Sequence, residues 1–263
     1  MTSPAKLLFV AVAALAAAAG AAGSAATPAG MVFVPAGEYA PLLRTAAEPE
    51  RVVVSGFWMD ERPVTNAEFL AFVTAHPQWR RSCVSPLFAD DNYLAHWAAD
   101  LELGPAAPPD SPVVRMSWFA ARAYADAQGK RLPTTAEWER SAAVGFTTED
   151  AATEPAVQRL INTWFSRPTP EVLPPAGGGR ANLLGLRDLH GLVWEWVDDF
   201  NAALVTGESR GSAGLERDLY CGAGAVGARD RTNYAAYMRA GYRASLKAAY
   251  SVPNLGFRCV LSP

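Results

Sequence analysis

The 263-residue sequence predicts a single α+β domain with little regular secondary structure and long loops. Three observations lead to this fold class. Strand-like runs of β-branched residues are short, helix-like patterns are few, and 21 glycines and 20 prolines supply turns along the whole chain. No internal repeat of fixed period interrupts this arrangement. A chain of this length is sufficient to bury one large core.

The first 26 residues have the organisation of a secretory signal. Lys6 gives an early positive charge, an Ala-rich apolar run begins at Leu7, and small residues over Gly23–Ala26 offer a cleavage position. The alternative is an uncleaved membrane anchor, because the apolar run approaches spanning length. We expect cleavage and a periplasmic or secreted domain over residues 29–263, with no membrane association after cleavage.

The first half of this domain begins with strands and continues with a helix. MVFVPAG, at 31–37, predicts a short strand closed by a Pro/Gly turn, and the β-branched run at 51–59 predicts a second strand. The spacing of the apolar residues then changes from that of a strand to that of a helix. Thr65 is an N-cap candidate, Glu68 is its capping-box partner, and Pro77 ends the predicted helix.

Two further helices are predicted after a long irregular segment at 78–112. Ser117 begins a helix that ends at Gly129, a residue typical of helix C-termini. Thr134 or Thr135 caps a short third helix. The segment from 147 to 179 contains few signals of regular structure, and a terminal strand is expected over NLGFRCV.

Charge and histidine content exclude some classes of function. The net charge of -3 gives no electrostatic footprint for nucleic acid, so we expect no nucleic-acid partner. The three histidines are His76, His96 and His190. They are scattered without metal-ligand spacing, and we expect them to be structural or surface residues rather than a metal site.

Five short segments, in order along the chain, resemble one known family. They are GMVFVPAGEY, FWMDERPVTNAEFLAFV, PVVRMSWFAARAYADAQGKRLPTTAEWERSA, NLLGLRDLHGLVWEWVDD and NLGFRC. Together they are similar to the formylglycine-generating enzyme, or sulfatase-modifying-factor, family. The resemblance implies a sulfatase-modifying-factor fold of the α+β class, distantly similar to C-type lectins.

The resemblance also implies a calcium site in the turn that precedes WEW. Its ligands would be the side chains of Asp188 and Glu195 with the carbonyls of Gly191 and Val193, because Ca²⁺ takes oxygen ligands of both kinds. The second calcium site of the family has no matching pattern here, so one calcium is expected. The alternative is that Glu195 pairs with an arginine. The available arginines are Arg239, Arg243 and Arg258.

The catalytic pattern of the family is missing. Its enzyme uses two cysteines that bind copper(I), and the matching positions fall among 227–235, where the sequence has no cysteine. Cys221 precedes this region and is a weak catalytic candidate, so copper is not expected. A disulfide between Cys221 and Cys259 is the alternative in an oxidising compartment, with Cys83 as the odd thiol.

The C-terminal region offers a possible groove for a peptide or anion, formed by Arg239, Arg243, Arg258 and Tyr237. The alternative is structural, with the arginines paired to carboxylates. The acidic candidates are Glu137, Glu139 and Asp198.

These features predict an exported, calcium-stabilised accessory or maturation factor for a periplasmic protein, with a metalloenzyme as the expected partner. The Tyr220–Cys259 region also resembles an exported, NirV-like branch of the family. Two alternatives are a metal-dependent oxidase of the formylglycine-generating type, with a site rebuilt around Cys221, and a glycan-binding lectin-like module.

Overall fold

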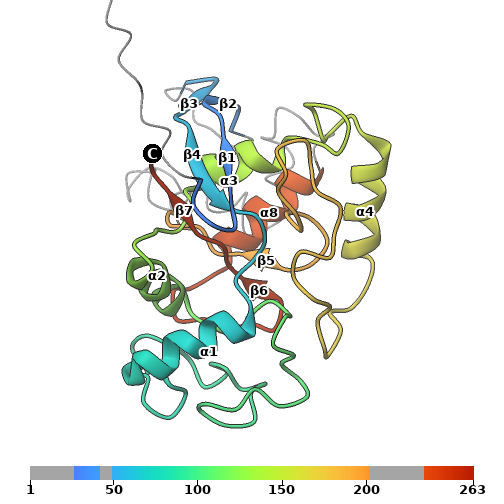
Figure 1. The fold of residues 1–263 in the computed structure, drawn as a ribbon. Coiled ribbons are helices and arrows are strands. Elements are labelled where there is room, and N and C mark those ends of the chain that lie inside the picture. Colours follow the sequence, from blue (N-terminus) through green and yellow to red (C-terminus); the bar gives the residue numbers. More distant parts are fainter. Residues whose placement is uncertain (1–26, 42–48, 202–233) are drawn as a thin grey trace, which may run out of the picture.

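A computed structural model describes residues 27–41, 49–201 and 234–263 (Figure 1). The predicted signal at 1–26 and the predicted thiol Cys221 lie outside these ranges. Within them, short strands and helices alternate with much loop, which confirms the α+β class. The strands are β1 (Met31–Val34), β2 (Gly37–Tyr39), β3 (Val52–Val54), β4 (Phe57–Asp60), β5 (Trp194–Glu195), β6 (Leu255–Gly256) and β7 (Val260–Leu261). The helices are α1 (Asn66–Ala75), the 3-10 helix η1 (Pro77–Trp79), α2 (Trp118–Ala127), α3 (Thr135–Ala142), α4 (Pro155–Phe165) and α8 (Tyr234–Ala244).

The main sheet joins the two ends of the folded chain. Its order is β1-β4-β7, with antiparallel pairing throughout. Met59 in the central strand faces Val32 on one side and Val260 on the other. Phe57 and Met59 are buried, whereas Trp58 between them is half-buried, because alternate side chains of a strand point to opposite faces. A hairpin of β2 and β3 and a parallel pair of β5 and β6 complete the strands.

The predicted helix starts are confirmed. Thr65 caps α1 and forms a reciprocal capping box with Glu68. Ser117 caps α2 by accepting from the amide of the third residue on. Of the two threonines considered for the third helix, Thr134 is the cap, and Glu137 completes a second capping box. These bonds satisfy amides that an α-helix leaves without partners in its first turn.

One helix contradicts the sequence interpretation. The segment from 147 to 179 was expected to lack regular structure, but it contains α4. Its N-cap, Glu154, makes no capping bond through its side chain to the helix, and the start signal that the sequence does contain is Pro155 at the first helical position. Only Val157 and Ile161 of this helix are fully buried. Its apolar residues nevertheless recur with helical spacing, from Val157 through Leu160 and Ile161 to Trp164 and Phe165, so the sequence does contain a periodic signal here.

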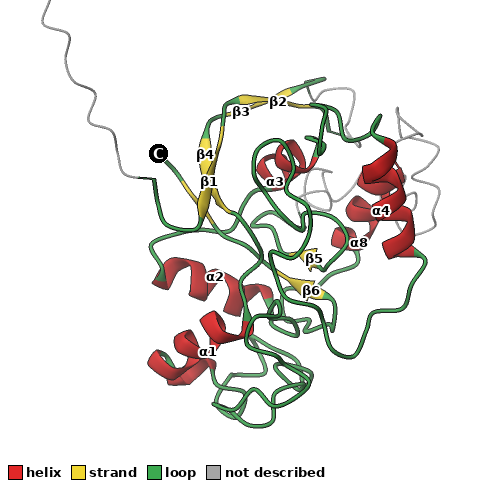
Figure 2. Cartoon of the chain, turned by 45° about the vertical axis from the view of Figure 1, so that its right-hand side comes forward, coloured by secondary structure: helices red, strands yellow, loops and turns green. Residues whose placement is uncertain are grey.

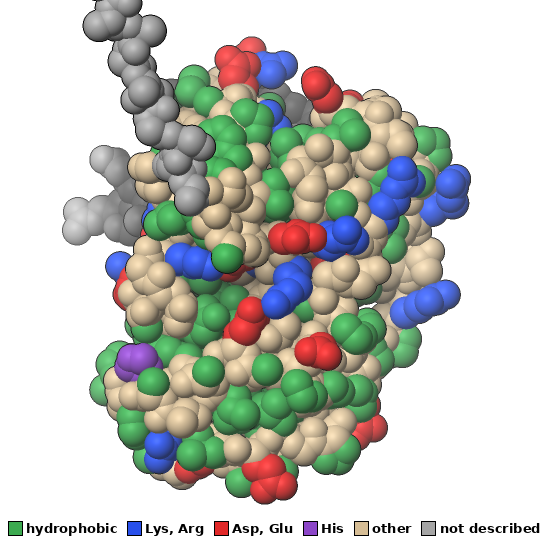
Figure 3. Space-filling model, viewed as in Figure 1, with side chains coloured by type: hydrophobic (Ala, Val, Ile, Leu, Met, Phe, Trp, Pro, Cys, Tyr) green, Lys and Arg blue, Asp and Glu red, His purple; other side chains and the backbone are tan. Residues whose placement is uncertain are grey.

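The helices divide into two groups around β5 and β6. Figures 1 and 2 both place α1 beside α2 at one end of the molecule and α4 on a different side, near α8. Acidic and basic side chains are interspersed across the face drawn in Figure 3. No helix in the described ranges combines the length and apolar character required to cross a bilayer.

Candidate functional site

Glu195 forms a buried ion pair with Arg258. The guanidinium Nε lies 2.8 Å from Oε2 and Nη2 lies 2.8 Å from Oε1, and both side chains are fully buried. The indole Nε1 of Trp138 donates to the same carboxylate at 2.7 Å. A buried carboxylate is tolerated when a charged partner and further hydrogen bonds compensate its desolvation. Glu195 was expected either to bind calcium or to pair with an arginine. The structure contains the pair with an arginine.

The remaining donors of Arg258 bind backbone carbonyls. Nη1 donates to the carbonyls of Asp60 and Glu61 at 3.3 and 3.2 Å, and Nη2 donates to that of Arg187 at 2.8 Å. All five guanidinium N–H groups therefore have acceptors. Because these acceptors come from β4, the turn before β5 and β5 itself, Arg258 holds three segments together. It is a core residue, not part of a groove.

A second buried network joins α3 to α8. Glu139 accepts from Arg239 at 2.9 and 2.6 Å and from Arg243 at 2.6 Å. Burial opposes ionisation of Glu139, but the two guanidinium groups outweigh it and lower its pKa to about 2. Of the three acidic partners considered for these arginines, Glu139 is the one they bind. Glu137 instead pairs with Arg131.

Trp138 connects the two networks. The guanidinium carbons of Arg239 and Arg243 lie 5.2 and 5.0 Å from the centre of its ring, within cation–π range. The same indole donates to Glu195. Two carboxylates, three arginines and one indole therefore form one continuous polar cluster between α3, α8 and β5.

An aromatic wall lies beside this cluster. Trp194 stacks on Tyr242 with ring centres 4.5 Å apart and on Phe165 at 5.6 Å. The enclosed space between this wall, Arg239 and Arg243 is about 20 Å³, room for a water molecule rather than a substrate.

A larger cavity of about 640 Å³ opens on the other side of Arg239. Its lining includes polar groups of the β2–β3 hairpin, α3 and α4. It also includes Ala235 and Ala236, at the start of α8. Arg239 lines both cavities, whereas Arg243 lines the smaller one. Tyr237, predicted as a groove residue, is partly buried and is not among the residues that line either cavity.

The predicted calcium ligands are in part engaged with protein groups. The Asp188 carboxylate accepts from the amides of Gly177 and Gly179 at 2.5 and 2.9 Å, which leaves about two of its lone-pair sites free. Gly191 has φ +95, as the predicted tight turn requires. Glu195 has little free capacity because Arg258 and Trp138 occupy both of its oxygens. Asp188 therefore keeps lone pairs for a cation, whereas Glu195, as it is positioned, keeps few.

The cysteines in the described residues are unpaired. Cys83 is exposed and Cys259 is buried. Burial and the neighbouring Asp60 carboxylate raise the pKa of the Cys259 thiol, so it stays protonated. The predicted Cys221–Cys259 disulfide involves a residue outside the described ranges and stays a prediction.

The three histidines have different surroundings. His190 is 3.1 Å from the carbonyl of Ala142, and burial lowers its pKa to about 4. His76 contacts the carbonyl of Phe72 at 3.0 Å. Neither ring nitrogen of His96 has a hydrogen-bond partner among the residues that the structure describes. Across the described ranges, no three His, Cys, Asp or Glu side chains form a cluster suited to a metal ion.

Comparison with known proteins gives the family. Residues 17–263 match the model of the sulfatase-modifying factor enzyme 1-like domain. The chain is 31% identical over 259 residues to the formylglycine-generating enzyme of Streptomyces coelicolor, with 77% of both chains covered. It is 29% identical over 178 residues to the serine/threonine-protein kinase pkn1 of Chlamydia caviae, of which it spans only 28%. A solved structure, PvdO from Pseudomonas aeruginosa, matches with a TM-score of 0.47 at 19% identity, covering 89% of this chain and 94% of that chain. The chain belongs to the sulfatase-modifying factor enzyme 1-like family, which includes the formylglycine-generating enzymes.

Proposed function

We propose that this chain is an exported accessory or maturation factor for a periplasmic metalloenzyme, and that it does not carry out the cysteine oxidation of the formylglycine-generating enzymes. One observation carries the proposal. The positions that match the two copper-binding cysteines, among 227–235, contain no thiol. Ala235, the last of these positions, contributes only a methyl group to the cavity beside Arg239.

The remaining thiols give no obvious replacement. Copper(I) binding relies on soft thiolate ligands. Cys259 is protonated and buried within the core, and Cys83 lies in the irregular segment after η1, outside the cavity lining. This leaves Cys221 as a single candidate. One thiolate does not reproduce a two-thiolate copper site.

The cavity of about 640 Å³ is the surface on which we place the partner. Its lining is charged, with Glu38, Glu50, Arg51 and Asp150 among the contributors. Charged groups of both signs select a partner by complementarity rather than by hydrophobic burial. A binding role therefore uses the charged groups that line the groove. It does not require the copper-binding cysteines that are absent from 227–235.

Metal analysis tests this proposal directly. Protein purified from copper- and iron-replete medium is expected to hold neither metal in stoichiometric amount. It is also expected to leave a cysteine-containing sulfatase-type peptide unoxidised, with Cys221→Ser indistinguishable from the wild type. Stoichiometric copper or iron that is lost in Cys221→Ser, together with conversion of the peptide, would establish the oxidase alternative instead. Specific binding on a glycan array would favour the lectin-like alternative.

Calcium at Asp188, with the carbonyls of Gly191 and Val193, is part of this proposal. After chelator treatment, calorimetric titration is expected to show one calcium per chain, because this ion takes carboxylate and backbone carbonyl oxygens as ligands. Asp188→Asn is expected to weaken binding, whereas Asp126→Asn, at an exposed position of α2, is the matched control. An absence of calcium heat in the wild type would remove calcium from the proposal.

A further inference from the structure

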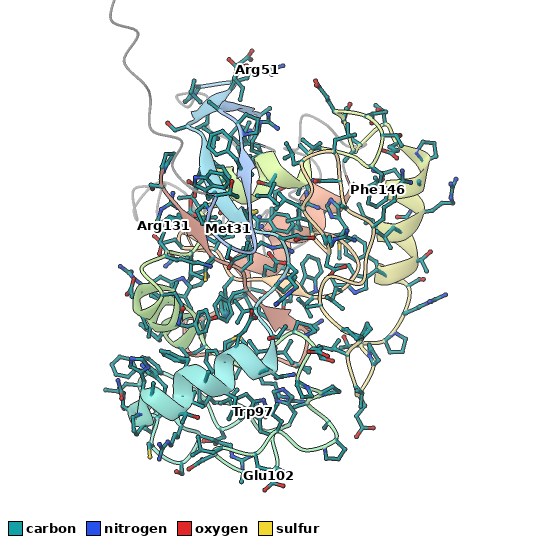
Figure 4. All side chains as sticks on the ribbon, in the orientation of Figure 1. Met31, Arg51, Trp97, Glu102, Arg131 and Phe146 are labelled. Atoms are coloured by element: carbon teal, nitrogen blue, oxygen red, sulfur yellow. The ribbon has the colours of Figure 1, made fainter. Side chains whose placement is uncertain are left out.

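A separate cavity of about 530 Å³ lies at the end of the molecule that holds α1. Its walls come from the first residue of α1, the loop segments 95–115 and 169–173, and Pro253. Trp97, labelled below α1 in Figure 4, marks this region. The volume is in the range of small-molecule sites. The lining is mixed, with apolar groups beside a small number of polar ones.

His96 is the first unusual group of this cavity. Both ring nitrogens are buried, and neither has a hydrogen-bond partner in the described part of the chain. Burial, followed by the charges of Arg115 and Arg81, lowers its pKa to about 4, so the ring is neutral near pH 7. A buried polar atom without a partner costs about 1–3 kcal/mol. A neutral imidazole offers one donor and one acceptor. Because both nitrogens are covered in this structure, a ligand in the cavity satisfies them once the ring turns toward it.

Arg115 is the second unusual group. Its guanidinium forms no hydrogen bond or ion pair with any described residue, although it lines the cavity. Arg81, by contrast, donates to the carbonyls of Leu94 and Trp97 at 3.4 and 2.9 Å. Arg81 therefore supports the loop, while Arg115 is left available for an anion.

The backbone at this cavity is strained. Leu94 and Arg115 have φ values of 48 and 55, and they are two of the three non-glycine residues with positive φ in the described ranges. The amide of Leu94 donates to the carbonyl of Arg115 at 2.8 Å, so a hydrogen bond joins the two strained residues. Such backbone costs about 1–3 kcal/mol per residue and is concentrated at functional sites.

We propose that this cavity binds a small organic acid with one carboxylate. The carboxylate pairs with Arg115, which matches its planar geometry, and the His96 ring turns toward the cavity to hydrogen-bond to the same ligand. The hydrocarbon part lies against apolar side chains. The apolar contributors include Ala95, Ala106, Val114 and Leu173. Glu171, also in the lining, disfavours a second negative charge on the ligand. This site is independent of the groove beside Arg239.

The test uses the full-length mature protein and a series of straight and branched monocarboxylates, from acetate to 4-phenylbutyrate, each paired with its neutral amide. The protein has three histidines, so the ring signals can be assigned by NMR after His labelling. At least one acid is expected to shift the His96 signals, raise the pKa of His96 and raise the melting temperature, because a nearby anion favours the imidazolium. The matching amide is expected to do none of these.

Two variants complete the test. Arg115→Asn keeps a residue that tolerates positive φ and is expected to weaken binding of the acid about 10- to 100-fold. Arg167→Gln removes the same charge from an exposed position two residues before Thr169, which lines the cavity, and is expected to bind as the wild type. If Arg115→Asn does not fold, the comparison of acids with amides still decides whether binding requires the carboxylate. The proposal is overturned if no acid perturbs His96, if amides bind equally well, or if Arg167→Gln loses as much affinity as Arg115→Asn.

Discussion

Replacing Arg258 by methionine is expected to reduce the free energy of unfolding by about 3–5 kcal/mol, because the substitution leaves the buried Glu195 carboxylate without its cation. It also removes the donors that bind the carbonyls of Asp60, Glu61 and Arg187. Denaturant unfolding monitored by tryptophan fluorescence measures the change. For a domain of this size, such a loss is a large part of total stability.

The control is the same substitution in an exposed pair. Arg51, labelled at the tip of the β2–β3 hairpin in Figure 4, pairs with Glu38 at 3.3 Å, with both side chains more than half exposed. Arg51→Met is expected to cost less than about 1 kcal/mol. Equal losses in the two variants would show that the buried pair has no special structural role.

Glu139→Gln is expected to have an effect of similar size, about 3–5 kcal/mol. The amide keeps the shape of the side chain but leaves Arg239 and Arg243 as two uncompensated buried charges. Thermal unfolding measures the loss, and Glu38→Gln in the exposed pair is the control. A melting temperature unchanged by Glu139→Gln would contradict the arrangement between α3 and α8.

The same residue predicts the acid sensitivity of the fold. The pKa of Glu139 is lowered from 4.5 to about 2 in the folded protein. A carboxyl with a lowered folded pKa stabilises the fold above its unfolded pKa and loses this contribution as the pH falls through the folded value. Stability is therefore expected to decline between about pH 4.5 and 2. This slope should be shallower in Glu139→Gln, and an identical slope would assign the acid sensitivity to other carboxyl groups.

The sequence predicted those elements whose signals are local. The capping boxes at Thr65 and Thr134 each require residues only three positions apart, and both were identifiable from the sequence. Helix α4 has no side-chain cap, but Pro155 at its start and the helical spacing of its apolar residues from Val157 to Phe165 were local signals that the interpretation overlooked. The prediction therefore relied too heavily on polar caps and too little on apolar spacing.

The candidate site depended on contacts between distant residues. The sequence indicated that Glu195 is buried and named three possible arginine partners, but only the fold selects Arg258, which is 63 residues away. The family resemblance identified the positions, among 227–235, at which the two copper-binding cysteines are absent. The cavity with His96 and Arg115 had no sequence signal, because its features are an absent partner and a backbone angle, neither of which a sequence pattern records.

The position of Arg258 near the C-terminus has a consequence for the order in which the chain folds. Its contact with the carbonyl of Asp60 spans 198 residues, so β4 cannot acquire this neighbour until residue 258 has been synthesised. Contacts of such large sequence separation slow folding. A truncation that removes Arg258 is therefore expected to leave the Asp60 and Glu61 carbonyls and the Glu195 carboxylate without the donor that they share.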